Sequence, residues 1–318
     1  ANSKIGFGDL ILLLRYFFKL KVSTHPNYLQ LSQTFLKGQI LEKLGQNQTA
    51  EEYWTNQLAQ AHTLYQKALF ETALSKHLNI KQDYSAFIGK QAKISQPNLQ
   101  KQFITQQANI DSLDKIIQSN QSTVDQKQAA IHTLLSKSLV HQRFDLFQQK
   151  YSYLPKNASE YKGYSSAKEH LKNKPEFANF IWNGSNITAQ LKCDNLLRLT
   201  QQLSKLPNDP LLNICLGELM RSEQGYSLQQ LSYDEQQKPT ISGKIFARGE
   251  IYKDIIKSSR KDDLHAYALY RAIQCYAPSG INDCGGIEVT KNTRKQWYDQ
   301  IKRDYPTSTW AKSLKYYW

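Results

Sequence analysis

The stretch "TFLKGQILEKLGQNQTAEEYWTNQLAQAH", residues 34–62, has the clearest pattern in this chain of 318 residues. Gly38, Leu41, Gly45, Ala50 and Trp54 stand at offsets 0, 3, 7, 12 and 16 from the first of them. Small residues let two antiparallel helices approach closely, and large residues fill the space between them. The spacing therefore predicts a pair of packed, antiparallel helices.

Two weaker fragments elsewhere in the chain show part of the same pattern of small, aromatic and apolar residues. They consist of Ala266, Tyr270, Ile273 and Pro278, and of Leu134, Phe147 and Pro155. Together the three fragments resemble the tetratricopeptide repeat, although they do not recur at its constant period of about 34 residues. The resemblance implies an all-α fold, an irregular solenoid of antiparallel helical hairpins. Unrelated hairpins with the same packing chemistry are the alternative.

Composition and periodicity also favour helices. Glycine (14) and proline (9) are scarce for this length, whereas an all-β chain would need many more turns. Apolar residues recur every three to four positions in residues 65–78, 109–120 and 123–140, which predicts helices there. Asp111 and Thr123 are the predicted N-caps of the last two.

The amino-acid composition changes in the middle of the chain. Residues 151–190 are rich in Ser, Asn, Tyr, Pro and Gly, so we predict an irregular connecting segment. It would join an N-terminal helical repeat region, 1–150, to a C-terminal one, 191–318. Residues 225–244 are predicted to form a second loop.

Two of the four cysteines flank one short loop, since Cys275 ends a helical pattern and Cys284 follows nine residues later. Pro278 and Gly280 can reverse the chain between them. We therefore predict a Cys275–Cys284 disulfide that staples a loop between helices, which requires an oxidising compartment.

The pairing of Cys193 with Cys215 is less direct. Residues 193–222 resemble a helical hairpin in which Cys193 would lie about 18 Å along the first helix and Cys215 about 8 Å along the second. Disulfide partners need Cα atoms within about 7 Å. The bridge therefore requires the chain before Asp194 to fold back, or the helices to be offset. Buried free thiols are the alternative.

The C-terminal segment has the residues of a docked tail. One helical face is predicted to carry Trp297, Tyr298, Ile301 and Tyr305. Ser308 is the predicted cap of a short final helix. The stretch "YPTSTWAKSL", residues 305–314, resembles the segment that closes repeats in tetratricopeptide lipoproteins of the Gram-negative envelope, which are accessories of outer-membrane assembly and cell-wall coordination. This resemblance implies a periplasmic protein. A lipidated N-terminal segment, removed from the sequence given, would tether it to a membrane.

The beginning of the chain fits that expectation. It opens Ala-Asn-Ser without a Met, as a mature form without its export signal would. The apolar run in residues 9–20 is cut short by Arg15 and Lys19, and a membrane span needs about 20 apolar residues. We predict a buried N-terminal helix there and no transmembrane span.

The chain is strongly basic, with a net charge of +14 from 41 basic and 27 acidic residues. Such a balance attracts polyanions. Lys291, Lys295 and Lys302 share one predicted helical face and form a candidate patch for an anionic surface or polymer. Most of the basic residues are lysines. Arginine binds phosphates and base edges better because its guanidinium group can donate two parallel hydrogen bonds, so nucleic acid is not favoured as a partner.

Signatures of catalysis are weak. The chain contains no G-x-S-x-G, H-E-x-x-H, G-x-x-x-x-G-K-[ST] or G-x-G-x-x-G motif, and its histidines are spread singly. We therefore assign no catalytic residue, metal ligand or cofactor. Glu218, on a partly apolar helix, is the one candidate for a general acid if burial raises its pKa.

We accordingly expect a non-catalytic periplasmic adaptor or scaffold that binds a protein or peptide partner on a helical-repeat surface. An enzyme acting on cell-wall glycan, with Glu218 as its acid, is the alternative. A cytosolic RNA-binding helical repeat protein is the second, and it predicts four free thiols.

Overall fold

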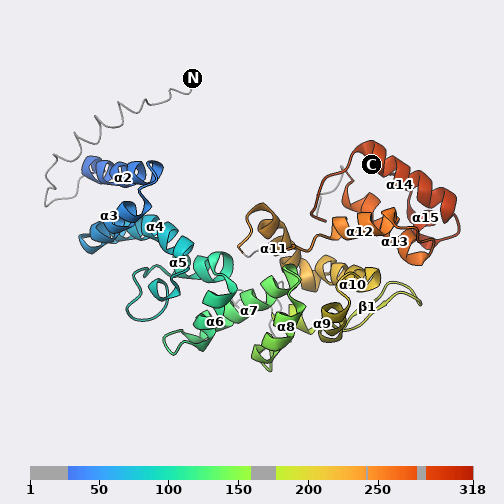
Figure 1. Ribbon diagram of the computed structural model, residues 1–318, viewed down its shortest axis with the longest axis horizontal. Coiled ribbons are helices and arrows are strands. Elements are labelled where there is room, and N and C mark those ends of the chain that lie inside the picture. The colour runs from blue at the N-terminus through green and yellow to red at the C-terminus, as the bar shows by residue number, and fades with distance from the viewer. Residues whose placement is uncertain (1–27, 159–176, 241–242, 278–283, 318) are drawn as a thin grey trace, which may run out of the picture. The chain divides into compact units, whose positions relative to one another are not determined.

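A computed structural model describes residues 28–158, 177–240, 243–277 and 284–317 (Figure 1). These residues are mostly α-helical, which confirms the predicted all-α class. The strands they contain are two-residue segments, β1 (Ser185–Asn186) and β2 (Lys192–Cys193), paired antiparallel. The helix expected at residues 9–20 lies outside the described residues.

The packing divides the chain after Phe103, not in the segment 151–190 where the composition changes. One compact unit spans Ala1–Phe103 and the other spans Ile104–Trp318. The segment 151–190, predicted to connect two regions, belongs to the second unit. The described residues at its end pack in a core, so the polar, glycine-containing composition there does not mark a linker.

The first unit contains three long helices that pack in chain order, α2 on α3 and α3 on α4. Its helical elements are α2 (Tyr28–Lys43), α3 (Asn47–Ala59), α4 (Leu64–Lys81), η1 (Tyr84–Ala86) and α5 (Pro97–Gln102). Gly38 of α2 faces Trp54 of α3, and a Cβ on Gly38 would come within 2.0 Å of the indole. The predicted hairpin in residues 34–62 therefore forms, and Gly38 provides the space that Trp54 fills.

A partly buried carboxylate connects these three helices. Glu42 of α2 accepts a hydrogen bond of 2.8 Å from Trp54 Nε1 and lies 3.2 Å from His77 Nε2 of α4. Glu71 of α4 is fully buried and accepts hydrogen bonds from the backbone N–H groups of Ser95 and Gln96. Each glutamate thus joins elements distant in sequence.

The second unit begins with helices whose ends largely follow the predictions. Thr123 caps α7 (Val124–Val140) in a capping box with Gln126, as the predicted cap requires. The preceding helix, α6 (Ile110–Gln118), is capped by Asn109, not by Asp111. Asp111 lies in the first turn instead, where a carboxylate also interacts favourably with the helix dipole.

The remaining elements of this unit form two apolar cores that α10 joins. They are α8 (Phe144–Lys150), η3 (Tyr151–Tyr153), η6 (Phe177–Ile181), α9 (Leu196–Lys205), α10 (Pro210–Arg221), η7 (Glu223–Gly225), α11 (Tyr226–Gln237), α12 (Arg248–Lys257), α13 (Asp263–Cys275), α14 (Lys291–Asp304) and α15 (Thr309–Ser313). On α10, Leu216 belongs to the first core and Ile214 to the second.

The first core is built by α7, α8, α9, α10 and α11 around aromatic residues from the middle of the chain. Phe177, Phe180 and Trp182 are buried in it, although they belong to the segment predicted to be an irregular connection. No α-helix lies in the described residues of this segment, 151–158 and 177–190. Aromatic side chains anchor residues 177–182 in the core.

The predicted loop at 225–244 is wrong, because α11 occupies most of it. Leu228, Ser232 and Glu235 stand on one face of α11 and are all buried. Two of these three side chains are polar, so the buried face lacks the apolar period that reveals a helix.

A buried charged cluster holds α11 against α7. Glu235 lies 3.6 Å from Lys137 Nζ and 3.0 Å from His141 Nε2. Lys137 also donates to the Ala108 carbonyl at 2.8 Å and to Thr240 Oγ1 at 2.8 Å. Burial alone would raise the pKa of Glu235, but its hydrogen bonds to His141 and Thr240 and the charge of Lys137 lower it to about 2.

The second core includes the C-terminal tail. Trp297 and Ile301 of α14 and Leu314 are buried in it, and Tyr305 packs against them. Ser308 caps α15 by accepting a hydrogen bond from the backbone of Ala311, as predicted. The aromatic face of the tail therefore packs within this unit.

Substitution of Gly38 by Ala should destabilise the first unit. The new methyl group would overlap Trp54, and overpacking of a filled interior costs about 1–3 kcal/mol, which outweighs the gain of about 1 kcal/mol in helix propensity. Urea unfolding followed by circular dichroism measures the difference. Ser32→Ala, at an exposed position of the same helix, should leave stability unchanged or slightly raised. Equal stability of Gly38→Ala and wild type would contradict the packing described.

Replacing Glu235 by Gln should make stability less dependent on pH in the acid range. A carboxyl whose folded pKa is depressed from 4.5 to about 2 stabilises the fold above pH 4.5, and this contribution disappears as the pH falls towards 2. Glu235→Gln should therefore be less stable than wild type at pH 6. The difference between their unfolding free energies should be smaller by about 2 kcal/mol at pH 3. Urea titrations at several pH values test this. The exposed Glu223→Gln is the control and should show no such narrowing.

Candidate functional site

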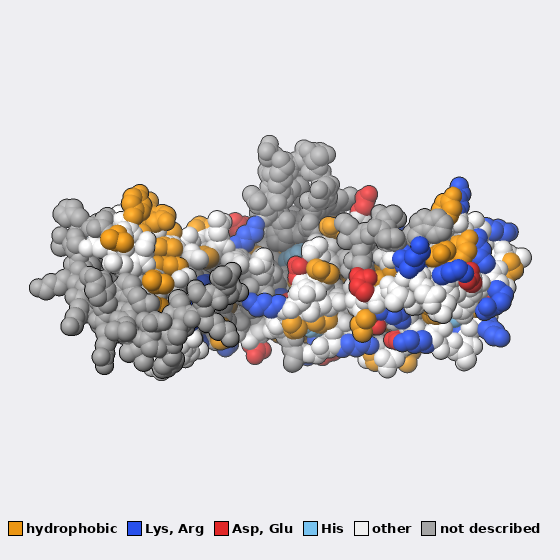
Figure 2. All heavy atoms as spheres, turned by 90° about the horizontal axis from the view of Figure 1, so that it is seen from above, with side chains coloured by type: hydrophobic (Ala, Val, Ile, Leu, Met, Phe, Trp, Pro, Cys, Tyr) orange, Lys and Arg blue, Asp and Glu red, His pale blue; other side chains and the backbone are white. Residues whose placement is uncertain are grey.

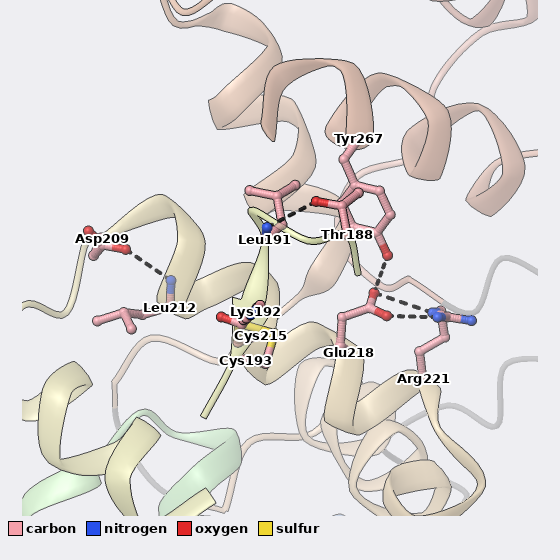
Figure 3. Close-up of a disulfide and its surroundings, with 10 residues drawn as sticks. All are labelled: Thr188, Leu191, Lys192, Cys193, Asp209, Leu212, Cys215, Glu218, Arg221 and Tyr267. Atoms are coloured by element: carbon pink, nitrogen blue, oxygen red, sulfur yellow. Dashed lines mark hydrogen bonds and ion pairs between the residues drawn. A yellow bond between two sulfur atoms is a disulfide. The ribbon is translucent and has the colours of Figure 1, made fainter. Parts of the chain in front are cut away.

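Glu218, the one candidate acid, lies on α10 facing α13. Its side chain is only 6% exposed. One carboxylate oxygen accepts a hydrogen bond of 2.7 Å from Arg221 Nη2, and the other accepts one of 2.5 Å from the hydroxyl of Tyr267 on α13 (Figure 3). The glycine before it, Gly217, allows the Arg248 side chain to approach, since a Cβ there would lie 3.2 Å from Arg248 Cγ.

The surroundings of Glu218 favour the charged carboxylate. Burial raises its pKa, but the hydrogen bonds from Arg221 and Tyr267 and the positive charges of Arg221 and Arg271 outweigh burial, so the pKa is lowered. Burial and the Glu218 charge raise the pKa of Tyr267. A general acid needs a proton to give near neutral pH. This arrangement holds an anion instead, and its contacts join α10 to α13.

Cys193 and Cys215 form one disulfide pair, with Cα atoms 5.3 Å apart (Figure 3). The expected hairpin, with Cys193 on a helix, is wrong in this detail. Asn195 caps α9, so the helix begins at Leu196 and Cys193 lies on β2. The chain before Asp194 folds back through the β1–β2 hairpin, which brings Cys193 to Cys215 on α10.

Cys275 and Cys284 form the second pair, with Cα atoms 5.8 Å apart, and the turn predicted at 278–280 lies outside the described residues. Both pairings agree with those expected from the sequence. They are compatible with an oxidising, extracytoplasmic compartment. The cytosolic RNA-binding alternative predicts four free thiols, and all four cysteines lie in these two pairs.

The three lysines of the predicted anionic-partner patch lie on α14 but have different surroundings. Lys291 is exposed, and Lys295 pairs with Asp299 at 2.6 Å. Lys302 donates hydrogen bonds of 2.6 and 2.8 Å to the carbonyl oxygens of Ala311 and Leu314. Lys302 thus binds the end of α15, as cations at helix C-termini do. It is not available to an external anion in the way that Lys291 is.

Exposed apolar side chains on the first unit were not predicted. Tyr28, Leu29 and Leu36 of α2 are 86%, 68% and 43% exposed. On α4, Leu64 and Ile80 are 88% and 82% exposed. Figure 2 shows hydrophobic side chains gathered on the surface of this unit. Periodicity predicts the two helices, but it cannot tell which apolar positions another helix covers.

Metal ligation and membrane insertion find no support among the residues that the structure describes. Within them, no three His, Cys, Asp or Glu side chains come together as metal ligands would. Their helices all lack either the length or the apolar character of a membrane span. His77, His141 and His265 are buried and interact with a carboxylate, a carboxylate and a backbone carbonyl, respectively. These three histidines are structural.

Oxidised protein should contain no free thiol, and loss of the 193–215 bridge should destabilise the second unit. Thiol titration in guanidinium without reductant should detect no thiol, and four after reduction.

The Cys193→Ser, Cys215→Ser double variant should lose about 3 kcal/mol of unfolding free energy, because the bridge closes a loop of 22 residues. The double variant at Cys275 and Cys284, whose loop is shorter, should lose slightly less. Four thiols in protein recovered from an oxidising compartment would contradict the pairing.

Comparison with known proteins supplies no relative from which a site could be transferred. No protein-family model, curated protein or solved structure matches the chain. The resemblance to tetratricopeptide repeats therefore stays a prediction from the residues quoted above, and the function has to be argued from the geometry of the described residues.

Proposed function

We propose that the protein is a non-catalytic scaffold of the bacterial cell envelope, which binds a protein or peptide partner on its first unit. The observation that carries this proposal is the exposed apolar surface of α2 and α4. Its members are Tyr28, Leu29, Leu36, Leu64, Tyr65 and Ile80. We call these six residues the apolar surface.

The members of the apolar surface on α2 lie on one side of that helix. Tyr28, Leu29 and Leu36 fall within about 100° of one another around the axis of α2. Gly38 and Leu41, on the opposite side of α2, are buried against the unit, and so is Ile40, which lies beside the edge of the exposed stripe. An apolar stripe on the outer side of an already packed helix suits a partner that buries it, since each large side chain removed from water contributes about 1.5–3 kcal/mol.

The way the helices pack supports a repeat-like scaffold. Helices α2, α3 and α4 contact one another in chain order, with a glycine–tryptophan contact at the first interface. Tetratricopeptide-like arrays use such interfaces to present extended helical surfaces to a peptide or a partner domain. The proposed architecture is an irregular solenoid of this kind.

The proposed location rests on two observations. Both cysteine pairs lie at disulfide distance, which suits an oxidising compartment. The closing segment 305–314 resembles that of periplasmic lipoproteins, so we propose the periplasm of a Gram-negative bacterium and a lipid anchor. Lysine and arginine side chains gather on the surface around α14 (Figure 2), and with Lys291 exposed they suit an additional anionic surface or polymer.

The partner should crosslink to the apolar surface. A photoreactive amino acid at position 36 or 64 of the full chain, irradiated in intact cells, should give a discrete adduct with another protein. The Leu29→Ser, Leu36→Ser double variant should reduce affinity for that protein at least tenfold, because two buried leucines are lost. Isothermal titration with the identified partner measures this change.

Two controls separate this proposal from its alternatives. The photoreactive residue at position 56, exposed and polar on α3, should give little adduct, and equal adducts from positions 36 and 56 would contradict the apolar surface. Glu218→Gln should leave partner affinity unchanged. If the purified protein cleaved cell-wall glycan and Glu218→Gln abolished the cleavage, the scaffold proposal would be wrong.

A further inference from the structure

A hollow of about 330 Å³ opens in the second unit where the turn between α9 and α10 meets α12. Its volume falls in the range of small-molecule sites. Neither the apolar surface nor the Glu218 contacts belong to it. The residues that line it are Pro207, Asn208, Pro210, Asn213, Lys244, Ile251, Asp254, Ile255 and Ser258.

The walls of the hollow are firmly held. Asp209 caps α10 by accepting a hydrogen bond of 2.9 Å from the backbone of Leu212. The side-chain amide of Asn213 donates to the carbonyl oxygens of Pro207 and Asp209 at 2.8 and 2.9 Å, which fixes the turn. The carboxamide oxygen of Asn213 is buried and accepts no hydrogen bond from the described residues. Ile255, which is 3% exposed, adds an apolar wall from α12.

Two opposite charges line the hollow without neutralising each other. Lys244 and Asp254 are both exposed, and neither forms an ion pair within the part of the chain that the structure describes. On the same helix as Asp254, Glu250 is paired with Lys253 at 2.8 Å. An uncommitted cation and an uncommitted anion beside apolar walls complement a ligand that has both charges and an apolar group.

We propose that this hollow binds a small zwitterion, namely a short peptide with a free ammonium group and a free carboxylate. Asp254 receives the ammonium group and Lys244 the carboxylate. Ile251 and Ile255 contact the apolar side chain. The hollow belongs to the second unit and shares no residue with the apolar surface of the first, so each proposal can fail without the other.

The dipeptide Ala-Leu is a suitable probe, compared with its N-acetylated and C-amidated forms. Nuclear magnetic resonance titration of the full chain should show that Ala-Leu binds and that each blocked form binds about fivefold more weakly, the upper end for an exposed ion pair. Asp254→Asn should bind Ala-Leu and N-acetyl-Ala-Leu equally. Lys244→Met should bind Ala-Leu and its amide equally.

Lys257→Met is the matched control, since it removes a charge from α12 at a position that does not line the hollow. It should discriminate between the free and blocked dipeptides as wild type does. The proposal is overturned if wild type binds none of the dipeptides, if it binds free and blocked forms equally, or if Asp254→Asn still distinguishes Ala-Leu from N-acetyl-Ala-Leu. Circular dichroism of each variant confirms that an exposed substitution leaves the fold intact.

Discussion

Buried glutamates hold this helical chain together. Glu71 binds two backbone N–H groups of the loop before α5, Glu218 joins α10 to α13, and Glu235 joins α11 to α7. A carboxylate removed from water is tolerated only where donors surround it, so each of these glutamates requires the elements that supply its donors to stay in place. The helices lack a constant repeat, and polar contacts specify here what a repeated apolar interface specifies in a regular array.

The two disulfides lie at connections of a different kind. The Cys193–Cys215 pair fastens the short β1–β2 hairpin, which has little hydrogen bonding of its own, to α10. The Cys275–Cys284 pair joins the end of α13 to the residues that precede α14. Neither connection has a buried glutamate as its main tie. Disulfides thus act where the backbone is irregular, whereas Glu218 and Glu235 join helices and Glu71 joins a helix to a loop.

Sequence patterns predicted the elements that have an apolar period, a capping residue or a small–large packing pair. Thr123 and the period of 123–140 predicted α7, and the spacing of Gly38 and Trp54 predicted the first hairpin, because both depend on local packing chemistry. They failed for α11, whose buried face includes Ser232 and Glu235. The partner that makes Glu235 tolerable there is Lys137, almost a hundred positions away, and no local window contains both. A lysine within the apolar run "HTLLSKSLV" was the available signal.

Structural charges differ from charges available for binding in whether the fold already supplies their hydrogen-bond partners. Glu218 attracts attention in the sequence because it is an acid on an apolar helix, yet Arg221 and Tyr267 already occupy both of its oxygens. A group whose hydrogen-bonding capacity is filled from within the fold has little left for a ligand. Lys244 and Asp254 are the reverse case, since they are unremarkable in sequence but uncommitted beside a hollow. In a chain whose buried acids serve the fold, surface groups without partners are the better guide to what it binds.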